Sequence, residues 1–248
     1  MLVGGIPLFL GGGAVSYVGW ALFGYGDTGS ETAITNKVND TGVVAGDTAG
    51  VGTARNSLAA AGFGGDRAIF GYGRVGNPAV SMTNLVSNKG VVATDTAGVG
   101  TARFYLAAAG FGGDKALFGY GYASANASIT NIVSNTGAVA TDTTAAGTAR
   151  RLFAAAGFGG DKAIFGYGSN SSGLRVSITN KVSNTGVVAT DTTGVGTARD
   201  DLAAAGFGGD KAIFGYGAPG LSSITNLVSN TGAVATDTAG VGTARYRL

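Results

Sequence analysis

The chain has 248 residues, of which 47 are glycine, 3 are proline and 12% are charged; its net charge is +2, and it contains neither His nor Cys. Without Cys there are no disulfides, thiolate nucleophiles or Cys-ligated zinc sites, and without His there is no imidazole base. The scarcity of proline excludes collagen, the 45% hydrophobic content argues against disorder, and the small net charge gives no footprint for nucleic acid. We therefore expect no cofactor and no nucleic-acid partner.

Two short strings recur along the chain. Both return after 46 to 49 residues, so five repeats occupy nearly its whole length. Phe-Gly-Tyr-Gly begins at Phe23, Phe70, Phe118, Phe165 and Phe214, and Thr-Ala-Arg ends at Arg55, Arg103, Arg150, Arg199 and Arg245. We predict a single domain, 1–248, with repeats 1 to 5 at about 11–57, 58–105, 106–152, 153–201 and 202–248.

Each repeat predicts four short strands, here described for repeat 5. The first run, Leu202–Gly208, is small and apolar, and the second, Lys211–Gly217, alternates Ile and Phe with Gly and Tyr. Gly-Gly-Asp separates them and favours a tight hairpin, because glycine accepts positive φ freely. A third run about Ile224 and a fourth about Val234 are separated by Asn-Thr-Gly, a second hairpin signal. No apolar stripe of helical period is present.

Four antiparallel strands at a period of about 40–50 residues are typical of a β-propeller blade. Leucine-rich, ankyrin and tetratricopeptide repeats are shorter. Calcium-binding β-rolls run their glycine-rich motifs without interruption, whereas Gly-Gly-Asp occurs once per repeat here. We therefore predict an all-β protein that forms a five-bladed β-propeller of four-stranded antiparallel blades.

Side-chain size suggests how such blades pack. The small first strands suit the crowded centre, and larger side chains suit the spaces between blades. We expect the recurring Phe63, Phe111, Phe158 and Phe207 to fill these spaces. Because glycine weakens individual strands, stability must come from stacking each blade on its neighbours.

The first 26 residues carry no charged side chain, and they include Pro7 and several glycines. A signal peptide needs a basic start, and a membrane helix needs about 20 apolar residues. We expect no clear signal peptide and no membrane insertion, but strands in phase with the repeats. Counting back from Phe23 places the inner strand of the first blade at Gly11, and residues 1–10 are expected to meet the last repeat and close the ring.

Arg-x-x-Leu-Ala-Ala-Ala, as at Arg199, leads into Lys-Ala-Ile-Phe-Gly-Tyr-Gly, a variable loop and the Thr-Ala-Arg ending. This order resembles the kelch repeat, in which an Arg-x-x-apolar strand precedes a strand that ends in a glycine pair. The resemblance implies propeller blades with Ala-Ala-Ala-Gly as the inner strand. Near-identical glycine-rich repeats are also similar to segments of bacteriophage virion proteins, which implies a tail or fibre component, or a place on an extracellular surface.

An Asp and an Arg recur eight residues apart in every repeat. A ring of such charges could hold a metal or an anion, but we favour a structural pair within each blade. Catalysis by two carboxylates needs different pKa values, which symmetric copies do not provide, so we predict no catalytic and no metal-binding residue. The pairs are Asp47 with Arg55, Asp95 with Arg103, Asp142 with Arg150, Asp191 with Arg199, and Asp237 with Arg245.

The repeats differ in two places that we expect on one face, opposite the near-constant turns. These are the loops between the second and third strands (27–33, 74–81, 122–128, 169–177 and 218–223) and the pairs after Thr-Ala-Arg (56–57, 104–105, 151–152, 200–201 and 246–247). Loops on rigid scaffolds carry function, although neutral drift explains the same divergence. By composition, the candidate contact residues are Arg74, Phe104, Tyr105, Tyr122, Arg151, Arg175, Asp200, Asp201 and Tyr246.

These observations favour a non-enzymatic scaffold that binds a protein or glycan partner through the variable loops. The alternative is a multivalent lectin whose sugar sites lie between blades and reuse residues common to all repeats. A glycosidase fits less well, because the only Glu is Glu31 and the Asp residues are mostly repeated in every blade.

Overall fold

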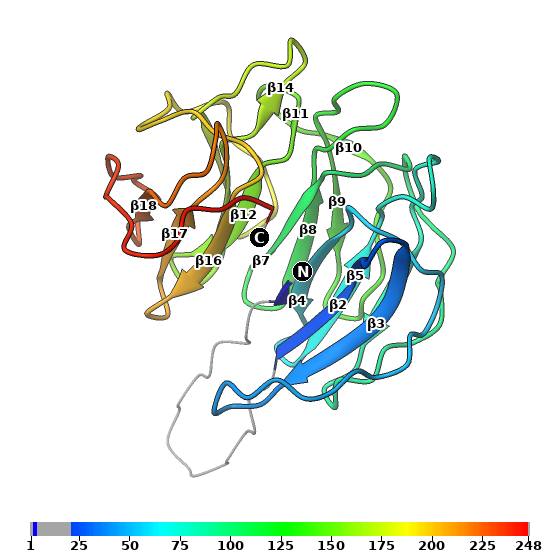
Figure 1. Cartoon of the computed structure of the whole chain (residues 1–248). Coiled ribbons are helices and arrows are strands. Elements are labelled where there is room, and N and C mark those ends of the chain that lie inside the picture. The colour runs from blue at the N-terminus through cyan, green and yellow to red at the C-terminus, as the bar shows by residue number, and fades with distance from the viewer. Residues whose placement is uncertain (1, 4–20, 248) are drawn as a thin grey trace, which may run out of the picture.

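The computed structural model describes residues 2–3 and 21–247, which are coloured in Figure 1. These residues form strands, turns and irregular segments without a helix, and all paired strands are antiparallel. The all-β prediction is confirmed. Within the described ranges, no helix is long and apolar enough to cross a membrane.

A tight hairpin begins each of repeats 2 to 5, as the Gly-Gly-Asp signal predicts. In repeat 3, Ala108 lies opposite Phe118, and the turn residues Gly112 and Gly113 have φ values of 63° and 79°, which glycine adopts without strain. The hairpins are β4 (Ala59–Phe63) with β5 (Arg67–Gly71), β7 (Ala107–Phe111) with β8 (Lys115–Gly119), β12 (Ala154–Phe158) with β13 (Lys162–Gly166), and β16 (Ala203–Phe207) with β17 (Lys211–Gly215).

A third strand pairs with the second strand of each hairpin. These third strands are β6 (Thr83–Val86), β9 (Ile129–Val133), β15 (Thr179–Val182) and β18 (Thr225–Val228). In repeat 1 the three strands are β1 (Leu2–Val3), β2 (Ala21–Asp27) and β3 (Glu31–Val38). Leu2 lies opposite Phe23, so β1 pairs with β2 at the edge opposite β3, and the prediction that residues 1–10 meet the last repeat is wrong for Leu2 and Val3. Gly11 and most of residues 1–10, where we predicted an inner strand and ring closure, lie outside the described residues.

The predicted fourth strand is corrected by the structure. Among the described residues it is regular only in repeat 3, as β10 (Thr143–Thr144); elsewhere it makes isolated bridges to the third strand. In repeat 5 the bridges join Thr225 to Thr238 and Val228 to Val234. The two bridges are three residues apart on the third strand and four apart on the fourth segment. The extra residue makes a bulge that interrupts the ladder, so most repeats are three-stranded sheets with an irregular fourth segment.

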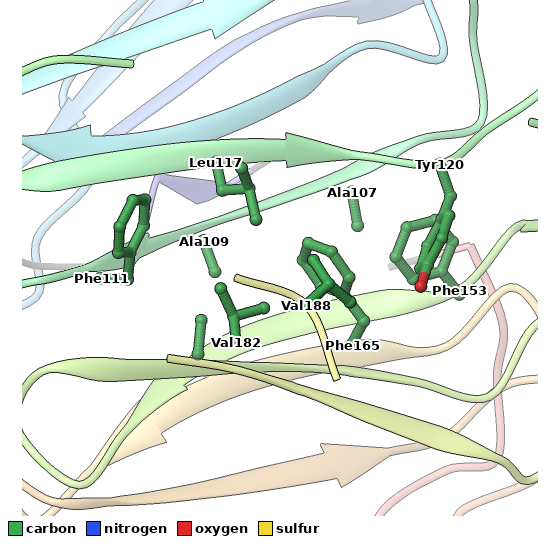
Figure 2. Close-up of a cluster of buried hydrophobic side chains, with 10 residues drawn as sticks. Ala107, Ala109, Phe111, Leu117, Tyr120, Phe153, Phe165, Val182 and Val188 are labelled. Atoms are coloured by element: carbon green, nitrogen blue, oxygen red, sulfur yellow. The ribbon is translucent and has the colours of Figure 1, made fainter. Parts of the chain in front are cut away.

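The sheets stack in chain order. The inner strands β4, β7, β12 and β16 lie next to one another, with the sheets of repeats 1 and 5 at the two ends of the row (Figure 1). A cluster of buried hydrophobic side chains fills each space between neighbouring sheets. Figure 2 shows the cluster between repeats 3 and 4, where Ala109 and Leu117 meet Val182.

The recurring Phe of the inner strand packs in these spaces in three of the four predicted positions. Phe63, Phe111 and Phe158 are 2–3% exposed, as predicted, whereas Phe207 is 44% exposed. The prediction is therefore wrong for Phe207, because this side chain lies on the outer side of the sheet of repeat 5, which no other described sheet covers.

The glycine that follows Phe in the second strand makes room for the next repeat. A Cβ at Gly71 would lie 2.5 Å from the ring of Phe118, and one at Gly166 would lie 2.5 Å from the ring of Phe214. A Cβ at Gly215 would instead find its nearest atom 3.4 Å away, on Thr225 of its own sheet. Some of the many glycines, such as Gly71 and Gly166, are therefore needed because an aromatic ring of the neighbouring sheet leaves no space for a larger residue.

Candidate functional site

The arginine of Thr-Ala-Arg is the centre of each contact between repeats. The side chains of Arg55, Arg103, Arg150 and Arg199 are fully buried. Arg103 donates from Nε to the carbonyl of Tyr120 at 2.7 Å, from Nη1 to the carbonyl of Thr101 at 3.1 Å and from Nη2 to Oδ1 of Asn131 at 2.7 Å. Its Cζ lies 4.2 Å from the ring centroid of Tyr72. One guanidinium thus joins a Tyr ring of its own repeat to the second and third strands of the next.

The repeated Asp completes this contact from the fourth segment of the next repeat. Asp142 accepts hydrogen bonds from the backbone N and Oγ1 of Thr101 at 2.9 and 2.6 Å, and from Nδ2 of Asn131 at 2.9 Å. Its Oδ1 lies 4.0 Å from Nη1 of Arg103. The carboxylate therefore holds the Thr-Ala-Arg segment of the preceding repeat mainly through Thr101.

The predicted pairing of Asp and Arg within one repeat is wrong. Each buried Arg pairs with the Asp of the following repeat, at N–O distances of 3.7–4.0 Å: Arg55 with Asp95, Arg103 with Asp142, Arg150 with Asp191, and Arg199 with Asp237. Arg55 and Asp237 thus find other partners, whereas Asp47 and Arg245 form no Asp–Arg pair in the described part of the chain. Asp47 accepts from Asn36 at 2.8 Å, and the exposed Arg245 lies 4.1 Å from the Tyr216 ring centroid.

Burial and hydrogen bonding shift the pKa values in this contact. Burial lowers the pKa of Arg103 from its ordinary value, although Tyr72 and Asp142 oppose this effect. Partial burial raises the pKa of Asp142, but hydrogen bonds from Thr101 and Asn131 and the charge of Arg103 lower it more, so the net shift is downward. Burial raises the pKa of the equivalent Tyr167 to about 12. At neutral pH the downward shift keeps Asp142 ionised, and the upward shift keeps Tyr167 neutral.

Acid is expected to weaken these contacts. The pKa values of Asp95, Asp142, Asp191 and Asp237 are lower in the folded chain than in the unfolded one, so their stabilisation is present above the unfolded value of about 3.9 and is lost as the pH falls through the folded values. Urea unfolding between pH 2 and pH 7 should show a constant midpoint above about pH 5 and a falling one below about pH 4. Asp142→Asn should reduce the acid dependence; an unchanged midpoint down to pH 2 would contradict the expectation.

The divergent loops and pairs lie on one face, as predicted. The residue that follows Thr-Ala-Arg pairs with the residue that follows Phe-Gly-Tyr-Gly at the same end of each sheet. The pairs are Asn56 with Arg74, Phe104 with Tyr122, Asp200 with Ala218, and Arg151 with Ser169, the last within the short strands β11 (Arg150–Arg151) and β14 (Ser169–Asn170). We call this end of the sheets the variable face.

Five predicted contact residues form one aromatic–arginine cluster on the variable face. The ring centroid of Phe104 lies 4.7 Å from that of Tyr105 and 5.5 Å from that of Tyr122. Arg74 Cζ lies 5.5 Å from the Phe104 centroid, and Arg151 Cζ lies 5.0 Å from the Tyr122 centroid. All five side chains are half-buried. The cluster spans repeats 2 and 3, so residues scattered in sequence become neighbours.

The other predicted contact residues lie apart from this cluster. Arg175 donates from Nε to Oδ1 of the buried Asp200 at 2.7 Å. Asp201 lies 3.6 Å from Nε of Arg247, and burial raises the pKa of its carboxyl. Tyr246 is 42% exposed. The Arg175–Asp200 and Asp201–Arg247 ion pairs extend the face towards repeat 5.

Two asparagines that the sequence did not single out position the arginines of the cluster. Asn56 accepts from Nε of Arg74 at 2.8 Å, and Asn126 accepts from Nη1 of Arg151 at 3.3 Å. Both asparagines belong to the segments that differ between repeats. This sequence difference is the signal by which they could have been predicted. Neither arginine has a carboxylate partner among the described residues.

A backbone ladder fixes the second residue of each divergent pair. Tyr105 N donates to Ser57 O, and Leu152 N donates to Tyr105 O, each at 3.0 Å; Asp201 and Arg247 continue the row. All five residues have φ between 52° and 60°. Non-glycine residues rarely adopt this region, so the contacts between neighbouring repeats hold the backbone of the variable face in a defined conformation.

A separate hollow lies at the opposite end of repeat 2. It has a volume of about 420 Å³ and is lined mainly by apolar side chains, including Phe63, Leu85 and Val91, with Arg67 beside them. Arg67 donates to the carbonyl of Asn135 at 2.6 Å. The hollow contains no acid–base pair, and in the described part of the chain no group of three His, Cys, Asp or Glu residues is placed to bind a metal.

The comparisons with known proteins add no relative. No protein-family model and no curated protein sequence matches the chain. The kelch and virion resemblances therefore stay predictions.

Proposed function

We propose that the chain is a non-enzymatic binding scaffold whose aromatic–arginine cluster contacts a protein partner. The observation that supports this proposal most strongly is the convergence of Phe104 from repeat 2 with Tyr122 and Arg151 from repeat 3 on one half-exposed patch. Aromatic and Arg side chains dominate binding energy at protein interfaces, where they provide large contact areas. Their rigid setting reduces the entropy lost on binding.

The charge of the cluster indicates the kind of protein segment that it would bind. Arg74 and Arg151 are each held by an asparagine rather than by a carboxylate. Their charges are therefore available to an incoming carboxylate, and charge-assisted bonds to Arg are stronger than neutral ones. An acidic segment with an apolar or aromatic side chain complements this arrangement.

A lectin with repeated sugar sites is the alternative. Such sites would reuse residues that are common to all repeats. Repeated side chains such as Arg103 and Asn131 are fully buried, and these two are bonded to each other. This burial favours the divergent residues as the contact surface.

Selection of peptides from a displayed random library can test the proposal with a matched pair of variants. Arg151 and Arg67 both lie over an aromatic ring, at 5.0 and 5.1 Å, but at opposite ends of the sheets. Arg151→Ser is expected to weaken the selected acidic peptides by about tenfold or more, whereas Arg67→Ser should change their affinity by less than about twofold. Equal effects would contradict the proposal, and so would glycan-array binding that survives replacement of the divergent loops, which would favour the lectin.

Two finer predictions are independent of the proposed binding site. A closed five-bladed propeller of kelch type would require repeats 1 and 5 to meet, with Arg245 against Asn36 and Asp47. A place in a bacteriophage tail or fibre would require the chain to occur in particles, which immunogold electron microscopy can test.

A further inference from the structure

The two ends of the row of repeats carry complementary halves of the same contact. On the outer side of repeat 5 we define the C-face by Phe207, Gly215, Tyr216, Thr243 and Arg245. On the outer side of repeat 1 we define the N-face by Phe23, Asn36, Val44 and Asp47. Figure 1 shows the strands of these two repeats at opposite ends of the row.

The C-face exposes residues that are buried in every other repeat. Phe207 is 44% exposed, against 2–3% for its three equivalents. Arg245 is exposed, although Arg55, Arg103, Arg150 and Arg199 are fully buried. Among the described residues, no ring of a following repeat lies over Gly215 as Phe118 lies over Gly71.

The C-face nevertheless has the arrangement that it would need for binding. Arg245 donates from Nη1 to the carbonyl of Thr243 at 3.0 Å, and its Cζ lies 4.1 Å from the Tyr216 centroid. The corresponding distances for Arg103 are 3.1 and 4.2 Å. The guanidinium is therefore already placed as in an internal contact.

The N-face is the matching acceptor. Asn36 donates from Nδ2 to Asp47 Oδ1 at 2.8 Å and to the carbonyl of Ala45 at 3.2 Å, as Asn131 does to Asp142 and Ala140 at 2.9 and 3.0 Å. Neither Asn36 Oδ1 nor Asp47 contacts an arginine in the described part of the chain. Val44 is 52% exposed, whereas its equivalents Val92 and Val188 are 8% and 7% exposed.

We propose that the C-face of one copy binds the N-face of a second copy of this chain, head to tail. Arg245 would then donate to Asn36, Thr243 would donate to Asp47, and Phe23 would cover Gly215. We assign a second copy, rather than repeat 1 of the same chain, because the Thr–Asp and Asn–Asp hydrogen bonds recur in all four internal contacts and both end faces are still left exposed. Such a heterologous contact generates a larger ring or a filament.

Two variants that each lose one face test the proposal by complementation. Phe207→Glu with Arg245→Glu removes the C-face, and Val44→Arg with Asp47→Arg removes the N-face. In sedimentation velocity the unmodified chain should increase in mass with concentration, each variant should have the mass of one chain, and their mixture should form a complex of two chains. Formation of that complex also shows that both variants are folded.

A matched control distinguishes loss of the N-face from added charge. Val43 neighbours Val44 and is 61% exposed, but its equivalents Val91 and Val187 are also 60% and 66% exposed, so this position is outside the contact. Val43→Arg with Asp40→Arg should associate like the unmodified chain. A chain that keeps the mass of one copy at all concentrations, or a mixture that forms no complex, would overturn the proposal and favour closure within one chain.

Discussion

Arg103→Ala is expected to lower the free energy of unfolding by about 3–5 kcal/mol. The side chain is fully buried between repeats 2 and 3, and its removal leaves the carbonyl of Tyr120 and Oδ1 of Asn131 without their donor. It also leaves a cavity beside the ring of Tyr72. Urea unfolding followed by circular dichroism measures the loss.

Arg245→Ala is the control for this variant. It changes the same residue of the same motif, but Arg245 is exposed. At concentrations where the chain is a single copy, we expect a change of less than about 0.5 kcal/mol. Similar losses for Arg103→Ala and Arg245→Ala would show that the Arg contact between repeats does not stabilise the fold.

Gly71→Ala is expected to cost about 1–3 kcal/mol, the range for overpacking a filled interior. The new Cβ would lie 2.5 Å from the Phe118 ring, and two more ring atoms lie within 3.1 Å. The ring is fully buried, so it cannot move without displacing the whole contact between repeats 2 and 3. Thermal or urea unfolding measures the change.

Gly215→Ala makes the same substitution at the same strand position without a ring above it, since its nearest neighbour would be Thr225 at 3.4 Å. It should be nearly neutral. The double variant Gly71→Ala with Phe118→Leu should recover part of the loss, because the two positions share one space. If Gly71→Ala and Gly215→Ala destabilise equally, the cost belongs to the strand backbone and not to packing.

The order of the strands and the position of the variable face could be predicted from the sequence. Gly-Gly-Asp specifies its hairpin through backbone angles that glycine adopts easily, as at Gly112 and Gly113. Once the strands alternate in direction, the loop at Tyr122 and the pair at Phe104 must lie at the same end of their sheets. These conclusions depend only on local turns and strand direction.

The partners across repeats could not be predicted in the same way. Every repeat carries the same Asp and Arg, so spacing along the chain cannot distinguish Asp95 from Asp142 as the partner of Arg103. The bulge in the fourth segment was equally hidden, because Val234 and Thr238 occur in a run that reads as an ordinary strand. Phe207 and Arg245 are exposed because repeat 5 lies at the end of the row. This exposure depends on the order in which the repeats stack, and the sequence of a single repeat does not reveal it.

The structure thus assigns different tasks to two sets of residues. Repeated side chains such as Arg103 and Asp142 hold neighbouring repeats together, and divergent ones such as Tyr122 and Arg151 form a patch on one face. The same repeated contact, left half-formed at each end, provides the head-to-tail interface that we propose. Binding of a partner at the variable face and association through the end faces would then be independent.

Two adjacent arginines allow the most direct test of this division. Arg150 is fully buried as the repeated residue, and Arg151 next to it is divergent and half-buried on the variable face. The measurement is the free energy of unfolding of Arg150→Ala and of Arg151→Ala in urea. The division predicts a loss of about 3–5 kcal/mol for Arg150→Ala and of less than about 1 kcal/mol for Arg151→Ala. Equal losses, or a larger loss for Arg151→Ala, would contradict it.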